Sequence, residues 1–164
     1  IIRWQVIEPR WIPSGSMLPT LQIQDKILVE KLITKINLKD NLFNLKDNII
    51  VFKPPEALIK AGYDSDIALI KRVIAIPGDK IEVKNGNLYL NDEIQNKFIT
   101  DKNINYSIGP IIVPENSLWV MGDNRNNSLD SHVWGPLPSE KIIGRAFFRY
   151  WPLNHFGPIY FPAA

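Results

Sequence analysis

The sequence predicts a mainly β fold, and three observations support this. Thirteen prolines and nine glycines interrupt short runs rich in Ile, Val, Phe and Tyr, a composition typical of many strands joined by turns. Asn85-Gly86 lies between two alternating runs, which favours a two-residue type I′ hairpin. With 164 residues, 45% of them hydrophobic, the chain can bury one core and still carry a modest insertion.

In the first half of the chain, residues 27–30 and 48–52 have the composition of strands. Residues 38–48 are polar and predict a loop or one helical turn, and residues 56–61 predict another helical turn. Residues 67–76 are almost wholly apolar and end at a Pro-Gly pair. They predict a strand that is buried on both faces.

In the second half, the hairpin strands occupy residues 81–84 and 87–90. Residues 91–110 are polar and loosely patterned, whereas residues 111–113 and 118–121 again have strand composition. The alternating runs around the hairpin predict a small β unit in the middle of the chain.

Towards the end, residues 122–135 are polar and predict turns. Ser139 predicts the N-cap of a short helix, and residues 146–152 return to strand composition. We therefore expect a β core formed by residues 1–81 and 116–164, with a small β insertion at residues 82–115.

Charge and composition exclude several functions. Lys and Arg exceed Asp and Glu by only two, so nothing favours nucleic acid or an acidic partner. The absence of cysteine excludes disulfides, thiolate metal sites and a cysteine nucleophile, and we expect no metal and no cofactor. No apolar run approaches the ~20 residues of a membrane helix, although the chain begins with Ile1-Ile2 rather than Met.

Residues 12–21 form the stretch with the clearest potential for chemistry. Two prolines, a glycine and two serines exclude a regular helix or strand, while the surrounding side chains are apolar. A rigid turn with apolar walls and two hydroxyl groups can present a serine nucleophile. A Ser-Gly-Ser sequence can equally be no more than a turn.

A serine nucleophile needs a base, and the sequence offers two kinds. Asp130 precedes His132 by two residues, so a Ser-His-Asp arrangement remains open, and His155 is the other histidine. Lysine is the alternative, but its amine must first lose a proton. Lys71 has the most apolar neighbours of the thirteen lysines, and burial lowers the pKa of a lysine. The plain alternative is that Lys71 reaches the surface from a strand end.

Three stretches together resemble the type I signal peptidases, which are membrane-bound serine proteases that remove signal peptides from exported proteins. Residues 13–21 resemble the nucleophile box of this family, residues 70–79 its lysine box, and residues 122–135 its last box. The boxes occur in the family's order and span almost the whole chain. Residues 126–138 are similar to the cyanobacterial and plastid thylakoid branch.

The resemblance implies a two-part antiparallel β architecture and a Ser-Lys dyad, with Ser16 as the nucleophile and Lys71 as the general base. The backbone N–H of Ser16 and the hydroxyl of Ser14 would form the oxyanion hole. The hydroxyl of Ser128 would orient the lysine amine.

The resemblance also implies an ion pair between Arg72 and Asp130. Adjacent residues of a strand point in opposite directions, so Arg72 can hold an aspartate while Lys71 faces the serine. His132 stands where the family usually has an arginine beside this aspartate, which leaves its role open.

The substrates of the family carry small residues, typically alanine, at the first and third positions before the cut. By correspondence, Ile12, Met17, Leu21 and Ile70 would line two shallow apolar pockets, although these residues could equally be core. The extended substrate would add along exposed strand edges.

The resemblance further implies preprotein signal peptides as substrates, a membrane helix upstream of Ile1, and a catalytic face on the trans side, in the periplasm or the thylakoid lumen. The present chain would then be a soluble catalytic fragment. Trp4 and Trp11 suit a membrane–water interface and contact with lipid, and they can equally be ordinary core or surface aromatics.

Two other functions remain open. A self-cleaving repressor-type protease shares the serine–lysine chemistry, but it would need a DNA-binding segment and a cleavable linker, and neither is visible. A non-enzymatic β binding module would use the same serines and lysine structurally. Cleavage of a peptide with an Ala-x-Ala site separates these alternatives.

Overall fold

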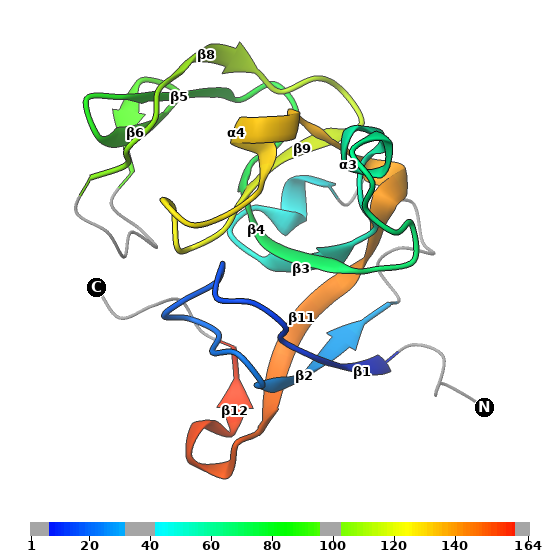
Figure 1. Cartoon of the computed structure of the whole chain (residues 1–164). Coiled ribbons are helices and arrows are strands. Elements are labelled where there is room, and N and C mark those ends of the chain that lie inside the picture. The colour runs from blue at the N-terminus through cyan, green and yellow to red at the C-terminus, as the bar shows by residue number, and fades with distance from the viewer. Residues whose placement is uncertain (1–6, 32–41, 96–102, 160–164) are drawn as a thin grey trace.

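The computed structural model describes residues 7–31, 42–95 and 103–159, which form two antiparallel sheets (Figure 1). The larger sheet has eight strands, in the order β1 (Ile7–Trp11), β2 (Lys26–Glu30), β11 (Ile142–Trp151), β3 (Ile49–Phe52), β4 (Leu69–Ala75), β9 (Ser117–Met121) and β10 (Leu137–Pro138), with β12 (Gly157–Pro158) paired to β11. The smaller sheet has the order β7 (Glu93–Ile94), β6 (Asn87–Leu90), β5 (Lys80–Lys84) and β8 (Ile108–Ile112). The prediction of a mainly β fold is confirmed.

Helical structure in the described residues is limited to short turns. They are η1 (Leu42–Leu45), α3 (Glu56–Lys60), α4 (Ser131–Trp134), η2 (Ser139–Lys141) and η3 (Leu153–His155). The predicted helical turn at residues 56–61 is confirmed by α3. Of the loop predicted at residues 38–48, only the part from residue 42 onward lies within the described residues.

The Asn85-Gly86 hairpin joins β5 to β6 as the sequence predicts. The backbone φ angles of Asn85 and Gly86 are 52° and 81°, and a type I′ turn requires positive φ at both central positions. Ile81 pairs with Leu90 across the hairpin, and both side chains are buried. Figure 1 shows this smaller sheet at the upper left, with the long β11 crossing the other sheet.

Strands β3 and β4 at the centre of the larger sheet are covered on both faces. Ile49 and Val51 belong to one buried cluster, and Ile50 and Phe52 belong to another. All residues of β4 after Leu69 are buried. The prediction of a strand with two buried faces is therefore confirmed, and the strand is slightly shorter than the apolar run.

Three local predictions differ from the structure. The strand predicted at residues 111–113 is β8, which begins earlier and ends at Ile112. Residues 131–134 form α4 inside a region predicted only as turns, because the Asp130 side chain accepts a hydrogen bond from the His132 N–H and caps the helix. Ser139 is not an N-cap, because Pro138 occupies that position and the Ser139 N–H donates to the Asn116 carbonyl.

The two sheets share one buried cluster. Trp119 and Met121 of β9 pack in the same cluster as Ile81 and Leu88 of the smaller sheet. Apolar packing thus joins the two sheets. The expected division of the chain into a β core and an insertion at residues 82–115 stays a prediction. No helix in the described parts of the chain is long and apolar enough to cross a membrane.

Candidate active site

The turn that carries Ser16 lies in the connection between β1 and β2. The Ile12 N–H donates to the Asp25 carbonyl at 2.9 Å, which closes the base of this connection. Met17 and Leu21 are buried in the core, and the Leu21 N–H donates to the Met17 carbonyl at 3.0 Å. Apolar side chains on either side of the turn therefore fix the backbone of Ser16.

Lys71 reaches this turn from the third position of β4. Its Nζ lies 2.7 Å from the Oγ of Ser16. Lys71 is 4% exposed and Ser16 is 9% exposed. The alternative in which Lys71 extends from a strand end to the surface is therefore wrong, because the strand turns this side chain into the protein.

Burial also changes the protonation of the amine. It lowers the pKa of Lys71 from its ordinary value of 10.5 to about 8, because the charged form loses hydration, and the negative charge of Asp130 raises the pKa in part. A substantial fraction of the amine is then neutral near pH 8. A neutral amine at this distance can accept the proton of the Ser16 hydroxyl.

A small cavity of about 40 Å³ opens beside the two side chains. Ser14 lies at its edge, and the Ser14 hydroxyl donates to the Ser16 Oγ at 3.3 Å. Ile12, Met17 and Ile70 line the cavity with apolar atoms. The structure therefore brings three of the four expected pocket residues to the candidate nucleophile.

Leu21 is the exception among the expected pocket residues. It does not line this cavity and is completely buried. Its side chain packs in the cluster that contains Ile27 and Val29 of β2. Leu21 is a core residue, and the pocket prediction for it is wrong because the turn after Met17 directs it inward.

Arg72 is also buried, but its partner is Asp123. The guanidinium donates from Nε and from a terminal nitrogen to the two carboxylate oxygens of Asp123, at 2.9 and 2.8 Å. Its other terminal nitrogen donates to the Asp47 carbonyl at 2.6 Å. The predicted pair of Arg72 with Asp130 is therefore wrong, although an aspartate of the expected loop does hold this arginine.

Asp130 instead organises its own loop. One of its carboxylate oxygens accepts from the Gly122 N–H at 2.9 Å, and the other accepts from the His132 N–H at 3.1 Å. The Nδ1 of His132 lies 2.5 Å from that second oxygen. The His132 ring stacks on Tyr106, with 3.8 Å between the ring centroids. The histidine thus pairs with the aspartate where the family usually has an arginine.

This arrangement does not support a histidine base. In the described residues the partners of the Ser16 Oγ are Lys71 and Ser14. His155 lies in η3 and is exposed.

Ser128 lies near the dyad without contacting the amine. Its Oγ is buried and has no hydrogen-bond partner within the described residues. The predicted hydrogen bond to Lys71 is therefore not made in this structure. Gly122 lies between the Ser128 hydroxyl and the Ser16 carbonyl. A Cβ added to Gly122 would fall 2.3 Å from the Ser128 Oγ and 2.4 Å from the Ser16 carbonyl oxygen.

Sequence reasoning missed two residues that hold the turn. The Asn124 N–H donates to the Ser16 carbonyl at 2.9 Å, and its side-chain amide donates to the Gly15 carbonyl at 3.0 Å. Asp123 is the second of these residues, because its carboxylate accepts a hydrogen bond from the Thr20 hydroxyl of the turn at 2.6 Å. Both Asp123 and Asn124 lie in the last box of the sequence, but nothing in a polar loop indicates which backbone groups it will meet.

No group of three or more His, Cys, Asp or Glu side chains within residues 7–31, 42–95 and 103–159 is placed to hold a metal ion. The chemistry of the site lies in its hydroxyl, amine and carboxylate groups.

A family model described as "Signal peptidase, peptidase S26" matches residues 1–151 of the chain. The chain belongs to this signal peptidase family. The resemblance predicted from the three boxes is therefore confirmed.

Two cyanobacterial relatives of this signal peptidase match nearly its full length. "Probable signal peptidase I-1" of Synechocystis sp. is 46% identical over 160 residues, which are 97% of this chain and 79% of that protein. "Signal peptidase I" of Leptolyngbya laminosa is 43% identical over 158 residues, which are 96% of this chain and 75% of that protein.

A plant relative is similar to the same extent. "Probable thylakoidal processing peptidase 2, chloroplastic" of Arabidopsis thaliana is 43% identical over 152 residues, which are 93% of this signal peptidase and 40% of the plant protein. The predicted similarity to the cyanobacterial and thylakoid branch is confirmed.

Proposed function

We propose that this signal peptidase removes signal peptides from preproteins with a Ser-Lys dyad, in which Ser16 is the nucleophile and Lys71 the general base. The observation that carries the proposal is the 2.7 Å separation between the Lys71 Nζ and the Ser16 Oγ. Both groups are buried, and burial lowers the pKa of the amine to about 8. A general base works best when its pKa lies near the working pH, and burial brings the pKa of this amine down towards the neutral range.

The acylation step transfers one proton and exchanges one bond. The Ser16 hydroxyl gives its proton to the neutral Lys71 amine while its Oγ bonds to the scissile carbonyl carbon. The carbonyl π electrons move to the oxygen. When this tetrahedral intermediate collapses, the C–N bond breaks, and the Lys71 ammonium protonates the leaving amine. The product is an ester between the signal peptide and Ser16.

Deacylation repeats the sequence with water. Neutral Lys71 takes a proton from water as the water oxygen bonds to the ester carbon. Collapse of the second tetrahedral intermediate breaks the bond to the Ser16 Oγ, which recovers the proton from Lys71. The signal peptide leaves as a carboxylic acid, and both side chains return to their starting states.

The negative charge that develops on the carbonyl oxygen needs hydrogen-bond donors. The backbone N–H of Ser16 and the hydroxyl of Ser14 serve this role in our proposal. Two observations support Ser14: its hydroxyl lies 3.3 Å from the Ser16 Oγ, and its side chain lines the small cavity. Ser128 has a supporting role, since its buried hydroxyl lacks a partner beside the dyad and can orient the amine once substrate enters.

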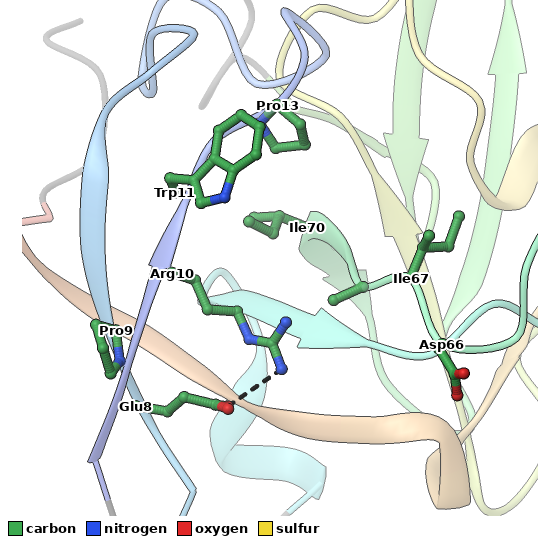
Figure 2. A pocket seen from close by; sticks show the side chains of 9 residues that line it. Glu8, Pro9, Arg10, Trp11, Pro13, Asp66, Ile67 and Ile70 are labelled. Atoms are coloured by element: carbon green, nitrogen blue, oxygen red, sulfur yellow. Dashed lines mark hydrogen bonds and ion pairs between the residues drawn. The ribbon is translucent and has the colours of Figure 1, made fainter.

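A larger groove of about 400 Å³ adjoins the small cavity and suits an extended peptide (Figure 2). It lies between β1 and residues 66–70. Strand β1 is at one end of the sheet, and β4 pairs with β9 only from Arg72 onward, so both strands have open edges here. A substrate strand can bond to these edges by β-augmentation.

The small cavity also supports specificity for alanine. Its volume of about 40 Å³ and its apolar wall of Ile12, Met17 and Ile70 suit a methyl group. Larger side chains would have to displace core residues, because interiors are close-packed. We therefore propose that the enzyme cuts after an Ala-x-Ala type sequence.

We also propose that the enzyme works at a membrane, with its catalytic face on the trans side. The Arabidopsis relative is named as a thylakoidal enzyme. Trp11 is 57% exposed beside the substrate groove, as an interfacial indole would be. Trp4, the other tryptophan considered for this role, lies outside the described residues.

The test is cleavage of a peptide with an Ala-x-Ala site by the purified chain. We expect Ser16→Ala and Lys71→Met each to reduce kcat/KM by at least about a thousandfold. The matched control is Lys53→Met at an exposed lysine, which should retain full activity. Full activity of Lys71→Met would rule the dyad out. Cleavage of its own chain without cleavage of the peptide would favour the repressor-type alternative.

A further inference from the structure

The substrate groove has a polar floor beyond its apolar entrance. Pro13 and Ile70 line both the small cavity and the groove, so the two are adjacent. Farther from Ser16, the groove is lined by Glu8 and Arg10 from β1 and by Asp66 from the opposite wall. Figure 2 shows Arg10 extending from β1 on the side of Ile70 and Ile67.

The spacing of β1 relates Arg10 to the candidate cleavage site. Glu8 and Arg10 are partly buried while Ile7, Pro9 and Trp11 are exposed, so Glu8, Arg10 and the buried Ile12 share the inner face of the strand. Arg10 lies one step of about 7 Å from Ile12, which lines the small cavity. A substrate strand alongside β1 advances by two residues over the same distance.

This step fixes which substrate residue meets Arg10. In this inference the first residue before the cut lies at the Ser16 end of the small cavity and the third lies at its Ile12 end, since both Ser16 and Ile12 line it. The next side chain on the same face is the fifth before the cut, and the polar part of the groove follows at that point. The fifth residue therefore lies beside Arg10.

Arg10 has hydrogen-bond donors that the protein does not use. One terminal nitrogen donates to Glu8 at 3.2 Å. The Nε is buried and has no partner within the described residues. Figure 2 shows the other terminal nitrogen pointing away from Glu8, toward the side of the groove that Ile67 and Ile70 line. A buried donor without a partner costs free energy that an incoming acceptor recovers.

The charged side chains of the groove indicate whether the substrate group that accepts a hydrogen bond from Arg10 is charged or neutral. Glu8 and Asp66 supply two carboxylates, and the cations beside them are the guanidinium of Arg10 and the ammonium of Lys31, whose Nζ lies 4.0 Å from the Glu8 carboxylate. A substrate carboxylate would bond to Arg10 but be repelled by both acids, and a lysine would bond to the acids but be repelled by Arg10 and Lys31. A neutral amide accepts the hydrogen bond without either repulsion.

We propose that Arg10 is a specificity-determining residue, which makes the enzyme favour an uncharged hydrogen-bond acceptor, glutamine or asparagine, at the fifth position before the cut. This inference rests on the proposed function, because it assumes that the peptide lies along β1 with its small residues at the dyad.

The experiment measures kcat/KM for four peptides that differ only in the fifth residue before an Ala-x-Ala site: glutamine, methionine, glutamate and lysine. Methionine matches glutamine in length and lacks the amide. We expect the glutamine peptide to be cleaved about fivefold better than the methionine peptide by the wild-type chain. Glutamate and lysine should give no advantage over methionine.

Arg10→Gln makes the groove more negative. Glu8 and Asp66 then remain without the guanidinium, so we expect lysine to replace glutamine as the favoured residue at low ionic strength. The matched control is Arg145→Gln on β11. Arg145 forms a similar half-exposed pair with Glu30 at 2.7 Å, and it also has a buried Nε without a partner within the described residues. It should keep the wild-type order of preference.

The outcomes separate this inference from the proposed function. If no peptide is cleaved, or if Ser16→Ala remains active, the proposed function fails. If the wild-type chain cleaves all four peptides equally, or if Arg10→Gln keeps the wild-type order, the role of Arg10 is overturned. Should Arg10→Gln not fold, Arg10→Lys retains the charge but not the planar fork, and loss of the glutamine preference in that variant supports the inference.

Discussion

The carboxylate of Asp123 binds the guanidinium of Arg72 through two hydrogen bonds, and the two side chains are 0% and 2% exposed. The same carboxylate accepts from the Thr20 hydroxyl at 2.6 Å. One buried aspartate thus joins β4, the loop after β9 and the turn that carries Ser16. Because Lys71 precedes Arg72 on β4, this ion pair fixes the strand next to the candidate base.

Removal of one partner of this buried pair should be strongly destabilising. Asp123→Ala leaves the Arg72 guanidinium buried without its counter-charge, so we expect a loss of about 3–5 kcal/mol in the free energy of unfolding. The double variant Arg72→Met/Asp123→Leu leaves no unpaired charge and should lose less than Asp123→Ala alone. Urea denaturation measures both quantities.

A control for that experiment is Glu82→Ala, which removes the more exposed Lys84–Glu82 pair at 3.5 Å. We expect this change to stay within about 0.5 kcal/mol. A similarly small effect of Asp123→Ala would show that the buried pair does not organise the site.

The identity of the partner of Arg72 illustrates what sequence can predict. Strand alternation indicates that Arg72 and Lys71 reach different groups, and this holds. It does not say which of two aspartates in one polar loop meets Arg72, because a loop has no periodicity. The family resemblance points to Asp130, whereas the loop path places Asp123 at Arg72 and Asp130 over the Gly122 N–H.

Elements whose residue types or periodicity form a strong local pattern are predictable from the sequence. The Asn85-Gly86 turn and the apolar run of β4 encode their structure in residue types alone. The short helix α4 was not predictable, because four residues carry no period and only the Asp130 cap defines it. Leu21 was likewise indistinguishable by sequence from the apolar residues that line the cavity.

The pH dependence of cleavage should report the Lys71 amine. Burial lowers its pKa to about 8, and the active form is the neutral amine. We therefore expect kcat/KM to rise with pH, to reach half of its maximum near pH 8 and to level off at higher pH. The negative charge of Asp130 raises this pKa, so Asp130→Asn should move the rising limb to lower pH.

A rate profile measured with the Ala-x-Ala peptide checks this prediction. The Lys53→Met variant is the control, since Lys53 is exposed and should leave the profile in place. A rising limb that stays at the pH of an ordinary lysine, above pH 10, would contradict a desolvated base.

Burial of Lys71 should also reduce stability at neutral pH. The native pKa of about 8 lies below the ordinary value of 10.5 that applies in the unfolded chain. The unfolded state therefore binds more protons between these values, and stability rises with pH across this window. Below about pH 8 the full cost of burial is present, and above pH 10.5 it is absent.

Lys71→Met removes this cost but also the contact with Ser16. We expect a net gain of about 1–2 kcal/mol in the free energy of unfolding at pH 7, which declines as the pH rises through the window. Urea titrations at several pH values measure the difference. A gain that does not change with pH would mean that better packing, rather than the removal of a buried amine, stabilises the variant.

Gly122→Ala should disrupt the turn that carries Ser16. The added Cβ would lie 2.4 Å from the Ser16 carbonyl oxygen and 2.3 Å from the Ser128 Oγ. The Ser128 side chain can rotate away, but the Ser16 carbonyl belongs to a backbone that Asn124 also holds. We expect a loss of about 1–3 kcal/mol in the free energy of unfolding, with a fall in kcat because Ser16 is displaced.

Gly109→Ala on β8 is the matched control, since nothing lies within 4 Å of its added Cβ. If both alanine variants keep wild-type stability and kcat, the close packing of Gly122 against the Ser16 carbonyl has no role in positioning the nucleophile.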